Sequence, residues 1–134
     1  MKRLILAAAI LLLGFASASA AEVSRIVVGF PPGQATDIVA RLVAERIGPI
    51  LGETFIVENR PGQGGSIALA QLAKTQADGR TLVLAPLASL VANPHLYKSV
   101  GYDTLKDFAP VTLVCDLPLL FVVNPDLPVK NVAE

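Results

Sequence analysis

The fold is decided by the stretch Val27-Val28-Gly29-Phe30-Pro31-Pro32-Gly33-Gln34-Ala35-Thr36-Asp37. It begins in a short apolar run, Ile26 to Phe30, which is typical of a strand buried on both faces of a parallel sheet. Two prolines and a glycine end this run, and a helical pattern begins at Thr36 and Asp37. The order predicts a strand, a tight turn and a helix N-terminus. Backbone N–H groups and the helix dipole at such a terminus favour an anionic ligand.

The residues that follow predict a helix and then a second strand. Apolar residues recur at helical spacing from Thr36 onward, with Thr36 as the expected N-cap and Asp37 complementing the helix dipole. Gly48-Pro49 is expected to mark a break near the end of the helix, and Gly52 its stop. The second strand is expected over Phe55 to Val57.

A second glycine-rich loop, Asn59 to Gly65, opens onto another helical segment, Ser66 to about Lys74. A turn at Ala77 to Arg80 then precedes a third strand, Thr81 to Ala85. The resulting β–α–β–α–β order predicts an α/β fold with a mainly parallel sheet and helices on both faces. Right-handed crossovers would place both glycine-rich loops at one edge, the carboxyl ends of the strands.

The pattern is less regular after Ala85. Pro86 to Lys98 is interpreted as a loop with a helical turn or two. Two further strands are predicted at Val111–Cys115 and Leu119–Val123, and Cys115 is expected to pack inside the first of them as a small hydrophobic residue. The first turn of a helix is predicted at Asn131–Glu134.

The N-terminal segment has the features of a secretory signal peptide. Met1-Lys2-Arg3 is a basic start, Leu4 to Leu13 is apolar, and Ala18-Ser19-Ala20 fits a small-x-small cleavage site. We expect residues 1–20 to be removed, leaving one α/β unit, 21–134, in the periplasm. An uncleaved N-terminal anchor is the alternative. No second apolar segment approaches membrane-spanning length, so no stable membrane insertion is expected after cleavage.

Charge and cysteine content narrow the function further. The chain has 134 residues, with 11 Lys and Arg against 11 Asp and Glu. The absence of a Lys/Arg run argues against a nucleic-acid partner. Cys115 is the only cysteine, which excludes an intrachain disulfide.

The two glycine-rich loops carry the binding chemistry that the residues suggest. The first could hold a carboxylate through backbone N–H groups of Gly33 to Thr36 and the Thr36 hydroxyl, although a sharp turn without a ligand is an equal alternative. The second repeats this design, and Gly64 and Gly65 allow close backbone approach. Neither loop matches a nucleotide-binding glycine motif. Two such loops at one sheet edge favour a small-anion site more strongly than either loop does alone.

Residues for catalysis are not evident. His95 is the only histidine, which excludes a histidine-based metal cluster, and it is expected to face solvent. Ser66 lacks a G-x-S-x-G context, so helix N-capping explains it better. Asp37 could bind a ligand hydroxyl or amino group or stabilise the helix start. We therefore predict no catalytic residue, no metal site and no cofactor.

Several motifs, in order and spacing, resemble the Bug family of periplasmic solute receptors, the tripartite tricarboxylate transporter (TctC-like) substrate-binding proteins. The resemblance extends from about Arg25 to Glu134. Its motifs are Phe30-Pro31-Pro32-Gly33-x-x-Thr36-Asp37, Val57-Glu58-Asn59-Arg60-Pro61-Gly62-x-Gly64-Gly65, Ala77-Asp78-Gly79, Asn93-Pro94-x-Leu96-Tyr97, Tyr102-Asp103-x-x-x-Asp107-Phe108-x-Pro110-Val111 and Val123-Asn124-Pro125.

The resemblance implies a type II periplasmic binding protein fold, with two α/β lobes closing over a small carboxylate held largely by main-chain groups. It implies a receptor that hands its ligand to membrane transporter subunits. Gln34-Ala35 departs from the glycine pair common in the family, which leaves the ligand open. The ligand-binding residues implied are Phe30, Pro31, Gly33, Gln34, Ala35, Thr36, Asp37, Gly64, Gly65 and Ser66, with Pro86 to Ser89 as a third contact.

Members of that family are considerably longer, so the sequence is expected to hold a signal peptide and the first lobe, ending near the crossover to a second. Alternatives are a periplasmic ligand-sensing partner of a sensor kinase and a truncated remnant without function. A small periplasmic enzyme is disfavoured, because no nucleophile–base pair is evident.

Overall fold

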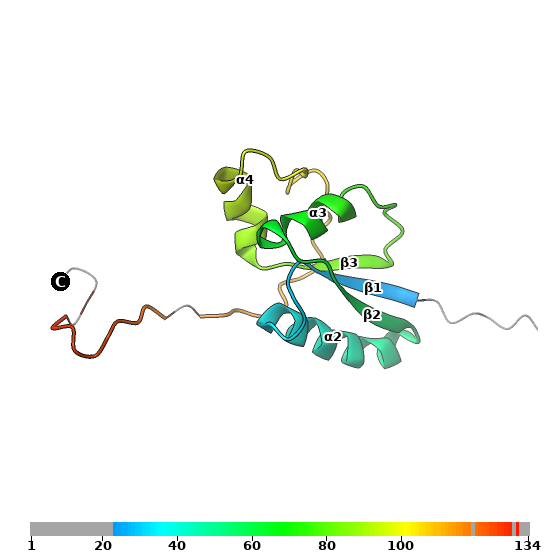
Figure 1. The fold of residues 1–134 in the computed structure, drawn as a ribbon. Helices are drawn as coiled ribbons and strands as arrows, with labels where there is room; N and C mark the ends of the chain where they lie inside the picture. Colours follow the sequence, from blue (N-terminus) through cyan, green and yellow to red (C-terminus); the bar gives the residue numbers. More distant parts are fainter. Residues whose placement is uncertain (1–22, 119, 130, 132–134) are drawn as a thin grey trace, which may run out of the picture.

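A computed structural model describes residues 23–118, 120–129 and 131 (Figure 1). Its centre is a parallel three-stranded sheet in the order β2-β1-β3. The strands are β1 (Val23–Val28), β2 (Thr54–Asn59) and β3 (Thr81–Leu84). Val28, the last residue of β1, is in register with the last residues of both neighbouring strands, Asn59 and Leu84. All three strands therefore end at the same edge of the sheet, as the sequence predicted.

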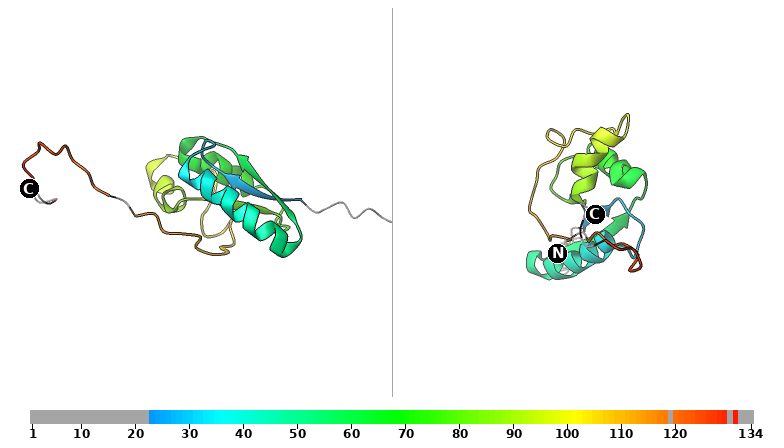
Figure 2. Two further views of the ribbon diagram at one scale, coloured as in Figure 1. Left: turned by 90° about the horizontal axis from the view of Figure 1, so that it is seen from below. Right: turned by 90° about the vertical axis from the view of Figure 1, so that its left-hand side faces the viewer.

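Helices cover both faces of this sheet. The long helix α2 (Ala35–Leu51) lies against one face, and α3 (Ser66–Leu72) and α4 (Asn93–Leu96) lie on the opposite side (Figures 1 and 2). A 3₁₀ turn, Gln63–Gly65, leads into α3, and a π-helical turn, Ala88–Ala92, continues into α4. The predicted α/β class, with a parallel sheet between helices, is confirmed.

The ends of α2 differ in part from the prediction. The helix begins at Ala35, and its N-cap residue is Gln34, so the prediction of Thr36 as N-cap is wrong. Pro49 lies inside the helix and does not break it. The predicted stop is confirmed, because Gly52 adopts a left-handed conformation (φ 68°) and its N–H bonds to the Gly48 carbonyl.

The core forms where β1 faces α2. Successive strand residues point to opposite faces of a sheet. Ile26 and Val28 pack with Ala40 of α2 in one buried cluster, and Phe55 of β2 and other partly buried residues surround it. Val27, on the alternate position of β1, is 1% exposed. The central strand is thus buried on both faces, which explains its unbroken apolar run.

The chain beyond residue 110 is extended: Val114 and Cys115 still lie beside α2, and the residues after them lead away from the domain (Figures 1 and 2). No strand forms in residues 111–118 or 120–123, so the two strands predicted at Val111–Cys115 and Leu119–Val123 are wrong, Leu119 itself being outside the described residues. An apolar run becomes a strand only when a neighbour takes its N–H and C=O groups. Cys115 is exposed, contrary to the expectation that it packs within a strand.

Some predictions fall outside the described residues. These are the signal peptide at 1–20 and the helical turn at 131–134, of which residue 131 alone is described. Within the part of the chain that the structure describes, no helix combines the length and apolar character needed to cross a membrane.

Candidate functional site

Three connections leave the sheet at the carboxyl ends of its strands. Residues 29–34 join β1 to α2, residues 60–65 join β2 to α3, and residues 85–89 follow β3. We call the first the first loop, the second the second loop, and the edge that all three form the carboxyl edge. The prediction that both glycine-rich loops share one edge is confirmed, and open parallel sheets bind ligands at this edge.

The two loops meet through their glycines. A Cβ atom on Gly29 would lie 2.5 Å from the α-carbon of Gly65, closer than real Cβ contacts. A Cβ atom on Gly65 would in turn lie 2.9 Å from the Ser89 hydroxyl and 3.2 Å from the Phe30 ring. The close approach predicted at Gly65 is therefore made by the protein itself. The role of Gly29 was missed, although a glycine at the end of a buried strand is a signal for such contact.

The first loop is joined to α2 through Asp37, which is 2% exposed. Its carboxylate accepts hydrogen bonds from the Gly33 amide at 2.9 Å, the Asn59 side-chain amide at 2.9 Å and Arg41 Nε at 3.0 Å. Arg41 Nη2 also pairs with it at 2.9 Å. These contacts, that with Arg41 first, lower the pKa of Asp37 from 3.8 to about 2.

Asn59 extends this network to the second strand. The same Asn59 amide donates to the Phe30 carbonyl at 3.0 Å, and its oxygen accepts from Arg41 at 3.2 Å. The last residue of β2 thus holds the first loop against the start of α2. Asn59 and Arg41 were not predicted as site residues, and an asparagine at the end of a parallel strand was the available signal. Both oxygens of Asp37 are engaged by protein donors, so the contacts show the helix-start role that the sequence left open.

The donors of the first loop are distributed differently from the prediction. The Gly33 amide is used by Asp37, and the Gln34 amide approaches the Pro31 carbonyl at 3.5 Å. The first intrahelical bond of α2 runs from Ile38 to Gln34 at 3.0 Å. The amides of residues 35–37 come before this bond and therefore have no carbonyl acceptor within the helix.

These three amides and the hydroxyl of Thr36, a partly exposed residue, lie in the first turn of α2 at the carboxyl edge. They stand at the N-terminus of a 17-residue helix, where the helix dipole favours negative charge. The negative charge of Asp37 lies in the same turn, but Arg41 is ion-paired with it at 2.9 Å. The formal charges at the helix start thus cancel. The polar groups that remain there without a formal charge are the backbone N–H donors.

Two amides at the end of the second loop and the start of α3 are already used within the turn. The Gly65 amide donates to the Gly62 carbonyl at 3.0 Å, and the Ser66 amide donates to the Gln63 carbonyl. Ser66 is fully buried and is the first residue of α3, whose N-cap is Gly65. The prediction of Ser66 as N-cap is therefore wrong, because its hydroxyl accepts instead from the side chain of Asn93 at 2.9 Å.

A buried polar cluster lies behind the second loop. The Asn93 side-chain amide donates to the Gly64 carbonyl at 2.9 Å and to the Gln63 carbonyl at 3.3 Å. The Ser89 hydroxyl donates to the same Gly64 carbonyl at 2.7 Å. The Tyr102 hydroxyl donates to the Ser89 carbonyl. The third segment, predicted as a ligand contact around Pro86 to Ser89, is thus fastened to the second loop, and Asn93 and Tyr102 were missed as its partners.

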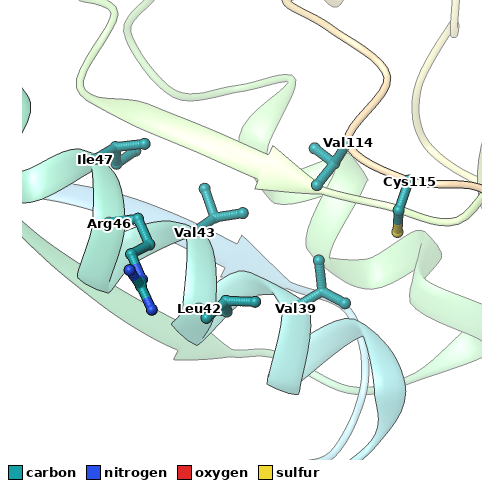
Figure 3. Close-up of a pocket in the computed structure, with 7 residues that line it drawn as sticks. All are labelled: Val39, Leu42, Val43, Arg46, Ile47, Val114 and Cys115. Carbon is teal, nitrogen blue, oxygen red and sulfur yellow. The ribbon is translucent and has the colours of Figure 1, made fainter.

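Two cavities lie away from the loops. The first, of about 380 Å³, is bounded by α2 and by Val114 and Cys115, which face that helix (Figure 3). The second, of about 440 Å³, lies between the turn that includes Leu90 and the loop that includes Asp103. Neither is lined by residues of the first or second loop.

The described residues offer little for metal or acid–base chemistry. Among them no group of three or more His, Cys, Asp and Glu side chains is arranged to hold a metal ion. His95 is exposed on α4, as the sequence predicted. The Asp103 carboxylate pairs with Lys106 at 3.0 Å, and this contact lowers the pKa of Asp103.

Comparison with known proteins gives a consistent result. Residues 39–134 match the family model described as tripartite tricarboxylate transporter family receptor. The chain is 42% identical over 104 residues to the protein BugT of Bordetella pertussis, a match that covers 77% of this chain and 32% of BugT. The chain spans about a third of the length of the curated relatives it matches.

Parts of several solved structures, among them the periplasmic binding protein BugD, have a similar fold. The R. palustris protein Rpa4515 with adipate is 36% identical, with a TM-score of 0.73 over 86% of this chain and 38% of that chain. MatC of Rhodopseudomonas palustris with bound malate is 35% identical, with a TM-score of 0.66 over 69% of this chain and 32% of that chain. These similar proteins bind solutes and are not enzymes, in agreement with the prediction.

Proposed function

This chain belongs to the tripartite tricarboxylate transporter receptor family, and on that premise we propose that it captures a small carboxylate in the periplasm. The observation that carries the proposal is the start of α2, where the amides of residues 35–37 and the Thr36 hydroxyl stand at the carboxyl edge. Two relatives hold dicarboxylates, adipate in one and malate in the other. A carboxylate suits these donors because it accepts several hydrogen bonds and carries negative charge.

In this proposal one carboxylate group of the ligand accepts from the amides of residues 35–37 and from Thr36. Asp37 and Arg41 neutralise each other, so the ligand meets donors without a competing net charge. The remaining proposed contacts give the site its shape and select the ligand by size. They are Phe30, Pro31, Gly33 and Gln34 on the first loop, Gly64, Gly65 and Ser66 on the second, and Pro86 to Ser89 on the third segment.

The transport role rests on the family. We propose that residues 1–20 direct export and that the ligand is passed to membrane transporter subunits. The carboxyl edge needs no covalent step for this task, since its polar groups are hydrogen-bond donors without a paired nucleophile and base. Binding from this edge alone is expected to be weak, because the donors contact the ligand from one side.

A titration followed by amide NMR tests the proposal. The full chain, labelled with ¹⁵N, is titrated with adipate or malate, and with the neutral diamide of adipate as the control. We expect saturable shifts at the amides of residues 35–37 with the dicarboxylates and none with the diamide. Unchanged amides, or equal shifts with the diamide, would show that the start of α2 does not bind carboxylates.

A further inference from the structure

We propose that Asn93 is a positioning residue of the carboxyl edge, which holds the second loop in place and through it sets the position of the first. Asn93 is 6% exposed and lies on neither loop. The inference rests on the proposed function in one respect, that the edge it positions binds a carboxylate. It goes beyond that function because it assigns the geometry of the site to a residue that does not contact the ligand.

The orientation of the Asn93 side chain follows from its partners. Its side-chain nitrogen faces two backbone carbonyls, those of Gly64 at 2.9 Å and Gln63 at 3.3 Å. A carbonyl can only accept a hydrogen bond, so the nitrogen rather than the oxygen must point at them. The third contact, with the Ser66 hydroxyl at 2.9 Å, joins the start of α3 to the same group. One buried amide nitrogen therefore contacts residues 63, 64 and 66, on both sides of Gly65.

The turn needs such an external support because its backbone is unusual. Gln63, Gly64 and Gly65 all have positive φ, at 48°, 60° and 89°. For Gln63 this conformation is unfavourable, since its Cβ crowds the backbone there. Hydrogen bonds from Asn93 to the carbonyls of residues 63 and 64 offset this cost.

The position of the turn is transmitted to the first loop by direct contact. Gly65 lies against the backbone at Gly29, where an added Cβ would come within 2.5 Å, and beside the ring of Phe30, 3.2 Å from where a Cβ on Gly65 would lie. Phe30 is also held by its carbonyl, which accepts from Asn59 at 3.0 Å. A displacement of Gly65 must therefore move the first loop or open the contact between the loops.

The substitution Asn93→Asp isolates the effect of the donor. Aspartate has nearly the same shape, but its carboxylate cannot donate and would face the two carbonyls with a negative charge. Asn93→Ala removes the donor without adding charge, and we expect a smaller effect. Tyr102→Phe removes the hydroxyl that donates to the Ser89 carbonyl, a milder change for use if both Asn93 variants fail to fold.

Ser24→Ala serves as the matched control. Ser24 is 2% exposed and its hydroxyl donates to Glu53 at 2.6 Å, near the amino end of β1 and away from the carboxyl edge. Its loss removes one part-buried side-chain hydrogen bond without touching either loop. A general loss of stability would affect this variant as well.

The experiment uses full-length variants at a temperature at which each is folded by circular dichroism, and it has two readouts. The first is adipate affinity by NMR titration. We expect it to fall about tenfold in Asn93→Asp, the size of effect expected when a displaced first loop loses one hydrogen bond to the anion. In Ser24→Ala we expect affinity to fall less than about twofold. The second is the amide shift of Gly33 in the absence of ligand, which reports on the first loop.

The positioning role is supported if adipate affinity falls only in the Asn93 and Tyr102 variants and the Gly33 amide shifts in the same variants. An unchanged Gly33 amide in Asn93→Asp, or an equal loss of affinity in Ser24→Ala, would overturn it. If the wild-type chain binds no dicarboxylate, the proposed function fails. The Gly33 amide still decides in that case whether Asn93 sets the position of the first loop.

Discussion

Gly29 and Gly65 approach so closely that a Cβ atom on the first would lie 2.5 Å from the α-carbon of the second. These residues belong to two connections that follow different strands of one sheet. Their contact turns two separate loops into one packed surface. The geometry of the carboxyl edge thus depends on both residues being glycines, which have no side chain to separate the loops.

Gly29→Ala is expected to destabilise the protein by about 1–3 kcal/mol, the usual cost of overpacking a close contact. The comparison variant is Gly33→Ala, where a Cβ would have no neighbour within 4 Å but φ is +85°. Backbone strain at that position costs about 1 kcal/mol. Urea unfolding of both variants checks the prediction, and an equal loss in the two would mean that the loops adjust to a methyl group at residue 29.

Stability is expected to fall in acid because of Asp37. Its pKa is lowered from 3.8 to about 2 in the folded protein, first by Arg41 and then by Gly33 and Asn59. The stabilisation by the carboxylate is therefore complete above the unfolded-state value and is lost as the pH falls from about 4 towards about 2. Asp37→Asn should be less stable at neutral pH and should lose less across that acid range. Urea midpoints at several pH values measure the difference, and parallel pH profiles for the two proteins would contradict it.

Thr36→Val is expected to weaken carboxylate binding by about 1–2 kcal/mol, because it removes a hydroxyl donor to a charged group while keeping the side-chain shape. The change should appear in the NMR titration with adipate or malate. Thr75→Val is a suitable control, since the Thr75 hydroxyl donates to the Gln71 carbonyl in an exposed turn away from the carboxyl edge. An unchanged dissociation constant would remove Thr36 from the proposed site.

Cys115 is expected to react with a thiol reagent at nearly the same rate in the folded and the unfolded protein. It is exposed and lies in the extended segment beside α2 (Figure 3). Access and thiolate content control such rates. Timed labelling with a maleimide, with and without urea, gives the comparison. Strong protection in the folded protein would indicate that residues 111–115 pack more deeply than the structure shows.

Much of the fold could be predicted because local patterns and the sheet agree. The apolar run before Gly29 suited a buried central strand, and the helical spacing after Thr36 suited a helix lying against it. The strands predicted at 111–115 and 119–123 had the same apolar character. They failed because strand formation depends on a pairing partner, and no local pattern reveals which edge is available.

The site could be placed but not detailed from the sequence. Glycines and strand order located both loops at one edge. Hydrogen bonds between distant residues then decided which groups remain for a ligand. The Asp37 carboxylate accepts from the Gly33 amide, and the Asn93 side chain donates to the Gly64 carbonyl of the second loop. Such side-chain partners come from other elements, so spacing within a loop does not indicate them.

The central place of β1 also has a consequence for how the chain comes together in time. Val23 pairs with Thr54 and Arg25 with Thr81, so the first strand to be synthesised has both of its partners later in the chain. No pair of neighbouring strands can form until β2 has been made, and the sheet is incomplete until β3 has been made as well. Parallel pairing of this kind is slow, because long loops must close before it is rewarded. The strand that is most buried in the folded protein therefore stays unpaired over this whole span of synthesis, and chaperones have that interval in which to bind it.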